Sequence, residues 1–296
     1  MSAAVAVQAP GPDWELDYYS RPILEADGKK RWELLICSTQ GLQPAPDPFR
    51  WSMDCPAASV NSQWLRGAIE AALAAAAEQG YGPPRRLRCW RGSMRAMVQR
   101  AAEGLGLELV PSRRCYGLVE WLRERQASVY PQEPGYMAGP LAPPPQPIPA
   151  VALPLPEAAR GDSWSWATLP ASTLAEAGGW EIAFPGLVAL PSEVDPATPV
   201  PGIRLFSRRR ALAIAGWLSG LEPTRLEVSS GQLVLEAGLE DRWILARLPE
   251  EEARLAQQAL AEARERAGGL QFIAIQASEE APSLEGFWLL RDLPDG

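Results

Sequence analysis

The stretch WELDYYSRPILEADGKKRWELLICST, residues 14–39, decides the fold that we expect for the first half of the chain. Two runs of strand-forming residues flank Asp27-Gly28, a dipeptide typical of tight hairpin turns. They predict strands at residues 14–23 and 31–38. The chain therefore begins with a β-hairpin.

Working outward from this hairpin, a third short strand is expected at residues 49–53, and helices and strands then alternate. Asn61 or Ser62 caps a helix whose apolar stripe ends before Gly80. The following elements are predicted as a strand at 86–90, a helix at 93–105, a strand at 107–110 and a helix at 116–129. The order βββαβαβα is the ribonuclease H-like order. We therefore expect an α/β domain with a mixed sheet and helices on both faces at residues 14–130, after a disordered N-terminus at residues 1–13.

A proline-rich stretch separates this domain from a second one. Residues 131–156 contain ten prolines, which is typical of an extended polyproline II linker, and we place the linker at residues 131–160. A recognition motif for a proline-binding domain is the alternative interpretation. Residues 161–296 are expected to form a second, mixed α/β domain.

The second domain is predicted to start near Trp164 or Trp180. Its expected elements are strands in WEIAFPGLVALP and GIRLF, a helix in SRRRALAIAGWLSGL, a three-strand meander, a long helix at residues 249–269 and terminal strands in LQFIAIQ and GFWLLRDL. A meander, a helix and a strand repeat the order of the first domain. The sequence therefore raises the hypothesis of a second, degenerate copy of that fold.

The composition excludes several classes of enzyme. The 296 residues include no histidine, so the chain forms no Ser-His-Asp triad, Cys-His pair or histidine metal site. The four cysteines are expected to be small buried residues, and a four-thiolate metal site is the weaker alternative; they are Cys37, Cys55, Cys89 and Cys115. No Walker, dinucleotide-binding or nucleophile-elbow motif occurs. We therefore expect no catalytic residue, no metal and no cofactor.

The N-terminus lacks the basic and apolar regions of a signal peptide. No run of about 18 apolar residues predicts a membrane span. Apolar residues make up 47% of the chain and charged residues 22%, which is an ordinary soluble composition. A soluble, cytoplasmic protein is therefore expected.

The charge is unevenly distributed along the chain. The net charge is minus 8, yet residues 1–130 carry 16 Lys and Arg against 14 Asp and Glu, whereas residues 131–296 carry 12 against 22. Residues 85–125 contain ten Arg and four Glu. Phosphate contacts depend on such a local excess rather than on the whole chain, so this region is the candidate site for an anionic partner.

Two strand-to-helix corners in this region combine arginines with an aromatic residue. Gly92 allows close approach to helix amides that could hold a phosphate, and Trp90 or Tyr116 could stack an unpaired base. In a parallel pair of strands the two corners would lie side by side. A solvated basic surface with Trp90 packed inward is the alternative. The candidate RNA-binding residues are Arg85, Arg86, Arg88, Trp90, Arg91, Arg95, Arg113, Arg114 and Tyr116.

A two-metal nuclease is the competing hypothesis for a ribonuclease H-like domain. Its carboxylates would include Asp17 in the first strand and Glu70 in the first helix. The central strand offers Cys89, Trp90 and Arg91 where a third aspartate is needed, so the pattern fails there. The ordinary interpretation is that Asp17 and Glu70 form ion pairs with Arg21 and Arg66. A further basic run, SRRR at residues 207–210, is either a second anion site or, more simply, a solvated first turn.

Four segments together resemble the Tab-two-like family of cyanobacterial proteins and their chloroplast relatives. They are WELDYYSRPILEADGKKRWELLIC, RCWRGSM, PSRRCYGLVEWLRER with the following VYPQEPGY, and the terminal GFWLL. The resemblance covers nearly the whole chain and is weakest in the proline-rich middle.

This resemblance implies RNA binding with a preference for A/U-rich leaders, and a role in translation and biogenesis of photosystem I rather than catalysis. It implies single-stranded messenger RNA as partner, with the translation machinery or assembly proteins as further partners. It also suggests a binding role for the terminal motif, Phe287, Trp288, Leu289 and Leu290, which the residues alone predict equally well as a core strand. An interaction scaffold whose acidic half docks a translation partner is a third hypothesis.

Overall fold

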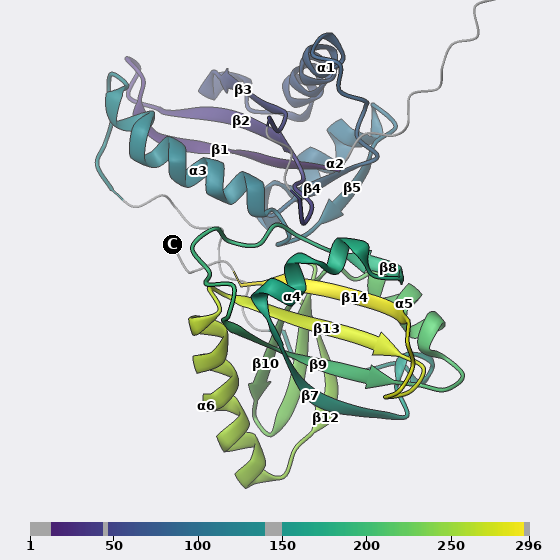
Figure 1. Cartoon of the computed structure of the whole chain (residues 1–296). Helices are drawn as coiled ribbons and strands as arrows, with labels where there is room; N and C mark the ends of the chain where they lie inside the picture. Colours follow the sequence, from purple (N-terminus) through teal and green to yellow (C-terminus); the bar gives the residue numbers. More distant parts are fainter. Residues whose placement is uncertain (1–12, 44–46, 140–149, 293–296) are drawn as a thin grey trace, which may run out of the picture. The chain divides into compact units, whose positions relative to one another are not determined.

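The computed structural model describes residues 13–43, 47–139 and 150–292 (Figure 1). The predicted disordered N-terminus, residues 1–13, lies outside the described residues apart from Asp13. The chain divides into two compact units, the first from residues 1–39 and 46–146 and the second from residues 40–45 and 147–295. Each unit has its own apolar core.

The first unit has the element order that the sequence predicts. Its strands form one mixed sheet in the order β3-β2-β1-β4-β5, in which β1, β2 and β3 are antiparallel and β1, β4 and β5 are parallel. The elements are β1 (Trp14–Leu24), β2 (Lys30–Ser38), β3 (Arg50–Cys55), α1 (Ser62–Glu78), β4 (Arg86–Cys89), α2 (Arg95–Glu103), β5 (Glu108–Pro111) and α3 (Tyr116–Ser128). The mixed α/β character is thereby confirmed.

Local chemistry explains where these elements start and turn. The hairpin between β1 and β2 turns at Gly28, whose φ of 78° is accessible to glycine without strain. Asn61 caps α1, because its side chain accepts hydrogen bonds from the backbone N–H groups of Gln63 and Trp64. Both features are the ones that the sequence predicts.

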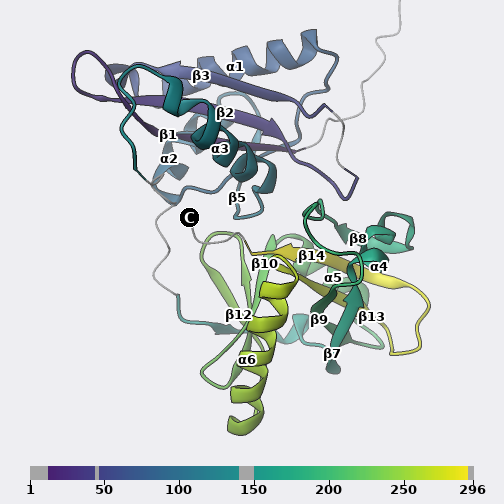
Figure 2. The ribbon, with the colours of Figure 1, turned by 60° about the vertical axis from the view of Figure 1, so that its left-hand side comes forward.

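The two faces of the sheet carry different helices. Side chains alternate along a strand, so Leu16 and Tyr18 of β1 point into the core that α1 and α2 cover. On the other face, Leu35 and Cys37 of β2 pack beneath α3. Figures 1 and 2 show α3 on one side of the sheet and α1 on the other. Glu15, Asp17 and their alternate neighbours therefore lie on the α3 face.

The second unit contains two sheets. One has the order β7-β9-β13-β14-β8, and the other has the order β10-β11-β12-β6. Its elements are β6 (Leu153–Pro154), β7 (Ser163–Pro170), α4 (Ala171–Ala175), β8 (Ile182–Gly186), β9 (Pro199–Phe206), α5 (Ala211–Ser219), β10 (Pro223–Ser229), β11 (Gln232–Ala237), β12 (Asp241–Arg247), α6 (Glu250–Arg266), β13 (Leu270–Gln276) and β14 (Leu284–Arg291).

The hypothesis that the second unit repeats the first fold is wrong. The meander β10-β11-β12 pairs with β6, whereas β13 pairs with β9 and β14 in the other sheet. In the first unit, by contrast, the meander and the later strands share one sheet. Periodicity identifies strands but does not choose their partners, which is why the repeated element order was misleading.

Ordered structure extends into both ends of the proline-rich stretch. At its start, Tyr136 forms a β-bridge with Ile23, and the N–H of Met137 donates to the carbonyl of Pro22 at 2.8 Å. At its end, β6 pairs with β12. Residues 140–149, the centre of the predicted linker, lie outside the described residues.

Candidate nucleic-acid interface

The two strand-to-helix corners lie beside each other, because β4 and β5 are parallel neighbours. Cys89 at the end of β4 is in register with Pro111 at the end of β5, and the N–H of Ser112 donates to the carbonyl of Cys89 at 3.0 Å. Trp90 and Arg91 therefore leave the same edge of the sheet as Arg113.

Asp17 lies at the centre of the first corner. Its side chain is completely buried, and three donors converge on it. Its Oδ1 accepts from the indole N–H of Trp90 at 2.8 Å and from Nε of Arg91 at 2.5 Å, and its Oδ2 accepts from Nη1 of Arg21 at 2.8 Å. Burial alone would raise the pKa of Asp17, but Arg21 and Arg91 hold that pKa below its usual value. The carboxylate is therefore ionised and fully engaged.

Trp90 has one fixed edge and one partly exposed ring. Its N–H points inward to Asp17, and part of the ring packs on the apolar cluster beneath α3. The guanidinium of Arg91 lies 4.8 Å from the centre of the Trp90 ring and 4.1 Å from that of Tyr19, so it is stacked between two aromatic rings. The indole is held in one orientation while part of its surface reaches solvent.

The candidate arginines separate into exposed and buried groups. Arg85 and Arg95 are exposed, and the only printed ion pair of Arg85 is a long one, 3.9 Å from Asp13. Arg86 and Arg113 are partly exposed, and Arg86 pairs with Asp13 at 2.5 Å. The buried members are Arg88, Arg91 and Arg114.

The second aromatic candidate is less accessible. Tyr116 is 7% exposed, and Arg114 lies 5.9 Å from the centre of its ring. Arg88 is in turn held by Asp13 at 3.0 Å. Of the predicted residues, Arg85, Trp90 and Arg95 are therefore those that a ligand can reach most easily, and the buried arginines hold the corner in shape.

The two carboxylates of the nuclease hypothesis do not converge. Asp17 lies on the α3 face, whereas Glu70 is exposed on α1, which covers the opposite face. Each forms the ion pair that the ordinary interpretation predicts, Asp17 with Arg21 and Glu70 with Arg66 at 3.1 Å. Metal-assisted cleavage needs carboxylates that share an ion, and this pair cannot do so.

Two features of the site escaped sequence analysis. Glu15 is buried and caps α3, because its Oε2 accepts from the N–H of Leu118 at 2.8 Å. Glu33 is buried beneath the end of α3, where Arg21 and Arg125 both donate to it. Charged residues at alternate positions of β1 and β2 were the available signal. The partners lie up to 103 positions away in the sequence, so the pairing itself had no local signal.

The C-terminal motif is the core strand of the two alternatives. Phe287, Trp288, Leu289 and Leu290 lie in β14 and are at most 3% exposed. β14 is paired on both sides, with β13 and with β8. These side chains therefore have no surface to offer a ligand in this structure.

The four cysteines are buried and unbridged, as small buried residues should be. Burial raises the pKa of the Cys89 thiol to about 12 and those of Cys37 and Cys115 well above the usual range. Thiols of such high pKa carry almost no thiolate at neutral pH, so they are unreactive packing residues.

Both halves of the chain match one protein family. Residues 13–125 match the N-terminal domain, and residues 142–291 match the C-terminal domain, of the family described as RNA-binding protein Tab2/Atab2. The chain belongs to the Tab2/Atab2 family. The resemblance read from the sequence is thereby confirmed, and RNA is the partner that the family description gives.

Two plant relatives extend this match over the whole of the Tab2/Atab2 fold. The chain is 38% identical over 299 residues to the chloroplastic TAB2 homolog of Zea mays, with 95% of this chain and 72% of that protein covered. It is 34% identical over 297 residues to the chloroplastic TAB2 homolog of Arabidopsis thaliana, with 95% and 75% covered.

The family description and the fold agree on further points. A description by RNA binding is in keeping with the non-enzymatic function expected for this Tab2/Atab2 family member. Within the described ranges, no helix is long and apolar enough to cross a membrane.

Proposed function

We propose that this protein binds an A/U-rich, single-stranded messenger leader without cleaving it, and thereby supports translation of photosystem I subunits. The RNA-binding family and the chloroplastic names of both plant relatives support this role. The preference for A/U-rich leaders follows from the family resemblance. A soluble, cytoplasmic location, with the translation machinery or photosystem assembly proteins as further partners, belongs to the same proposal.

The observation that carries the proposal is the fixed orientation of Trp90. Stacking of an unpaired base on an aromatic ring gains most when the ring is already immobile, because no side-chain entropy is then lost on binding. The hydrogen bond to Asp17 and the stacked Arg91 provide that immobility. Trp90 would therefore be the stacking platform of the site.

Phosphate groups would be held by the exposed cations next to this platform. Arg95 opens α2, and no side chain caps the first turn of that helix. Exposed Gly92 and Ser93 leave the approach to the turn open. Arg85 lies before β4 and adds a second accessible charge. These contacts recognise the backbone and not the base, so they would supply affinity that depends on salt.

The first prediction concerns the aromatic face of Trp90. Trp90→Phe and Trp90→Leu both remove the hydrogen bond to Asp17, but only the phenylalanine keeps a ring for stacking. We expect Trp90→Leu to weaken binding of a short A/U-rich RNA by about 5- to 100-fold, since stacking contributes ~1–3 kcal/mol per base. Trp90→Phe should retain most of the affinity, as measured by fluorescence anisotropy with labelled RNA.

The matched pair separates stacking from a packing role. Melting curves of both variants show whether the first unit stays folded. Equal losses of affinity in the two folded variants, or no loss in either, would contradict the assignment of Trp90 as a stacking platform.

A further inference from the structure

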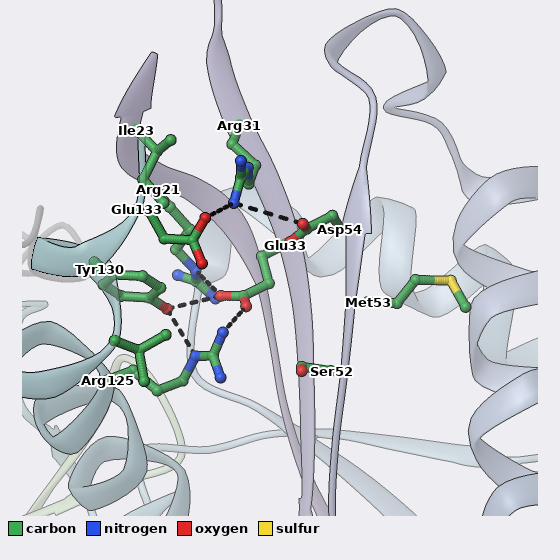
Figure 3. A pocket seen from close by; sticks show the side chains of 11 residues that line it. Arg21, Ile23, Arg31, Glu33, Ser52, Met53, Asp54, Arg125, Tyr130 and Glu133 are labelled. Atoms are coloured by element: carbon green, nitrogen blue, oxygen red, sulfur yellow. Dashed lines mark hydrogen bonds and ion pairs between the residues drawn. The ribbon is translucent and has the colours of Figure 1, made fainter. Parts of the chain in front are cut away.

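A cavity of about 190 Å³ lies on the same face of the sheet as Trp90, at the far end of β1. It is enclosed by β1, β2, β3 and the segment after α3, as Figure 3 shows. Its volume is several times the ~30 Å³ that one water molecule occupies in the liquid. The cavity is therefore large enough for more than an isolated water.

The inner wall of this cavity is a fixed, buried network. Glu33 accepts from Nε of Arg21 at 2.8 Å, from the hydroxyl of Tyr130 at 2.7 Å and from Arg125 (Figure 3). Nη2 of Arg21 is buried and has no hydrogen-bond partner. A buried donor without a partner is destabilising, so it marks a place where an acceptor belongs.

The charges that line the cavity are balanced. Three arginines, Arg21, Arg31 and Arg125, face three carboxylates, Glu33, Asp54 and Glu133. Arg31 bridges the two rim carboxylates, at 3.0 Å from Glu133 and 3.6 Å from Asp54 (Figure 3). A phosphate would meet as much repulsion as attraction here, whereas a neutral group with both donors and acceptors would meet complementary partners.

The cavity and the stacking platform are joined by one carboxylate. Asp17 holds Trp90 with one oxygen and Arg21 with the other. Asp17 and Arg21 are four residues apart in β1, which corresponds to ~13 Å along the strand. A single-stranded RNA that stacks a base on Trp90 could therefore place a neighbouring base in the cavity.

We infer that this cavity binds one unpaired nucleobase through the donors and acceptors of its edge. The inference rests on the proposed RNA-binding function and gives it a second contact, which reads the base rather than the backbone. A nucleobase is flat, uncharged and bears donors and acceptors on one edge, as this lining requires.

The test uses two neighbouring residues of β3 on opposite faces. Ser52 is in register with Leu35, on the α3 face, whereas Met53 is in register with Leu34, on the other face. Figure 3 shows the Met53 side chain pointing away from the cavity. Ser52→Phe therefore fills the cavity mouth, and Met53→Phe is the matched control. Both positions are exposed on an edge strand, where phenylalanine is well tolerated.

Binding of the four free nucleosides to the full chain is measured by calorimetry, with inorganic phosphate as a separate ligand. We expect the wild-type protein and Met53→Phe to bind at least one nucleoside, and Ser52→Phe to bind it at least tenfold more weakly. Inorganic phosphate should not bind at this site. If Ser52→Phe fails to fold, Asp54→Asn at the exposed rim replaces it and should show the same direction of change.

The outcomes also separate this inference from the proposed function. Nucleoside binding that Ser52→Phe leaves unchanged, or no nucleoside binding by the wild-type protein, overturns the nucleobase pocket. Phosphate binding that Ser52→Phe abolishes overturns it too, in favour of an anion site. In each case an RNA affinity that depends on Trp90 leaves the proposed function intact, whereas wild-type protein that binds no RNA defeats that function itself.

Discussion

The carboxylate of Asp17 shows how a single residue can resemble a metal ligand and serve another purpose. Three donors from Arg21, Trp90 and Arg91 surround it in a fully buried position. Breaking such a buried pair typically costs about 3–5 kcal/mol, because the remaining charge has no solvent. Arg91 is therefore a positioning residue, and its replacement would change the fold around Trp90 together with any contact to RNA.

Glu15 carries the clearest pH dependence among the described residues. Burial raises its pKa from 4.5 to about 7, although the N–H of Leu118, Arg88 and Thr39 oppose that shift. Between these two values the folded protein holds the proton more tightly than the unfolded chain does. The free energy of unfolding should therefore fall as the pH rises from about 5 to about 7.

Glu15→Gln should remove this dependence. The amide carbonyl can still accept from Leu118, but it never ionises. We expect the variant to be as stable as the wild-type protein at pH 5 and more stable by roughly 3 kcal/mol at pH 8, as measured by denaturant unfolding. A wild-type protein whose stability relative to the variant is the same at both pH values would show that Glu15 does not titrate in this range.

At the scale of secondary structure, β14 illustrates how packing explains a motif. Trp288 lies against two glycines, one in its own strand and one in β8. A Cβ on Gly286 would lie 2.3 Å from Cη2 of Trp288, and a Cβ on Gly186 would lie 2.0 Å from Cδ1. The glycines are therefore what allows the indole to lie flat within a buried strand.

Gly286→Ala should destabilise the second unit by about 1–3 kcal/mol, since it overpacks a buried ring. Gly67→Ala is the control, because Gly67 lies in α1 with nothing within 4 Å of its added Cβ and should become more stable by ~0.5–1 kcal/mol. Melting curves measure both changes. Below its melting temperature Gly286→Ala should bind RNA normally, and a specific loss of RNA affinity would instead favour a binding role for the motif.

Elements with local signals were predictable from the sequence. The turn at Gly28, the cap at Asn61 and the start of α6 after Pro249 all depend on a few neighbouring residues. β7 was missed, although its alternating SWSWATLP pattern is a strand signal, because the expected start of the domain lay within it. Sheet pairing in the second unit had no local signal, and its order was therefore wrong.

The candidate site was predictable in position but not in the roles of its residues. The excess of arginine marked residues 85–125, and the parallel pairing of β4 and β5 brought the two corners together as expected. The sequence could not separate Arg91, which is buried against Asp17, from Arg95, which is exposed. That distinction depends on partners 74 positions away, which only the fold brings into contact.

For the whole molecule, the uneven charge is the property that matters most for binding. The first 130 residues are slightly basic, while residues 131–296 carry 22 Asp and Glu against 12 Lys and Arg. An acidic second unit would repel RNA on average, so the account assigns the phosphate contacts to the first unit. The acidic surface is then available for a protein partner of the translation or assembly machinery.

The salt dependence of RNA binding tests this assignment most directly. Arg85→Ala/Arg95→Ala removes two exposed cations beside Trp90 without disturbing the buried pair of Arg91. Arg208→Ala/Arg209→Ala is the matched control, because it removes two exposed arginines before a helix of the second unit. The affinity for a short A/U-rich RNA is measured for both variants and the wild-type protein over a series of salt concentrations.

The account predicts that Arg85→Ala/Arg95→Ala flattens the slope of log affinity against log salt by about 1.4, at ~0.7 for each lost phosphate contact on a single strand. The control should keep the wild-type slope. Equal slopes in all three proteins, or a flatter slope in the control alone, would contradict RNA binding at the β4–α2 corner of the first unit.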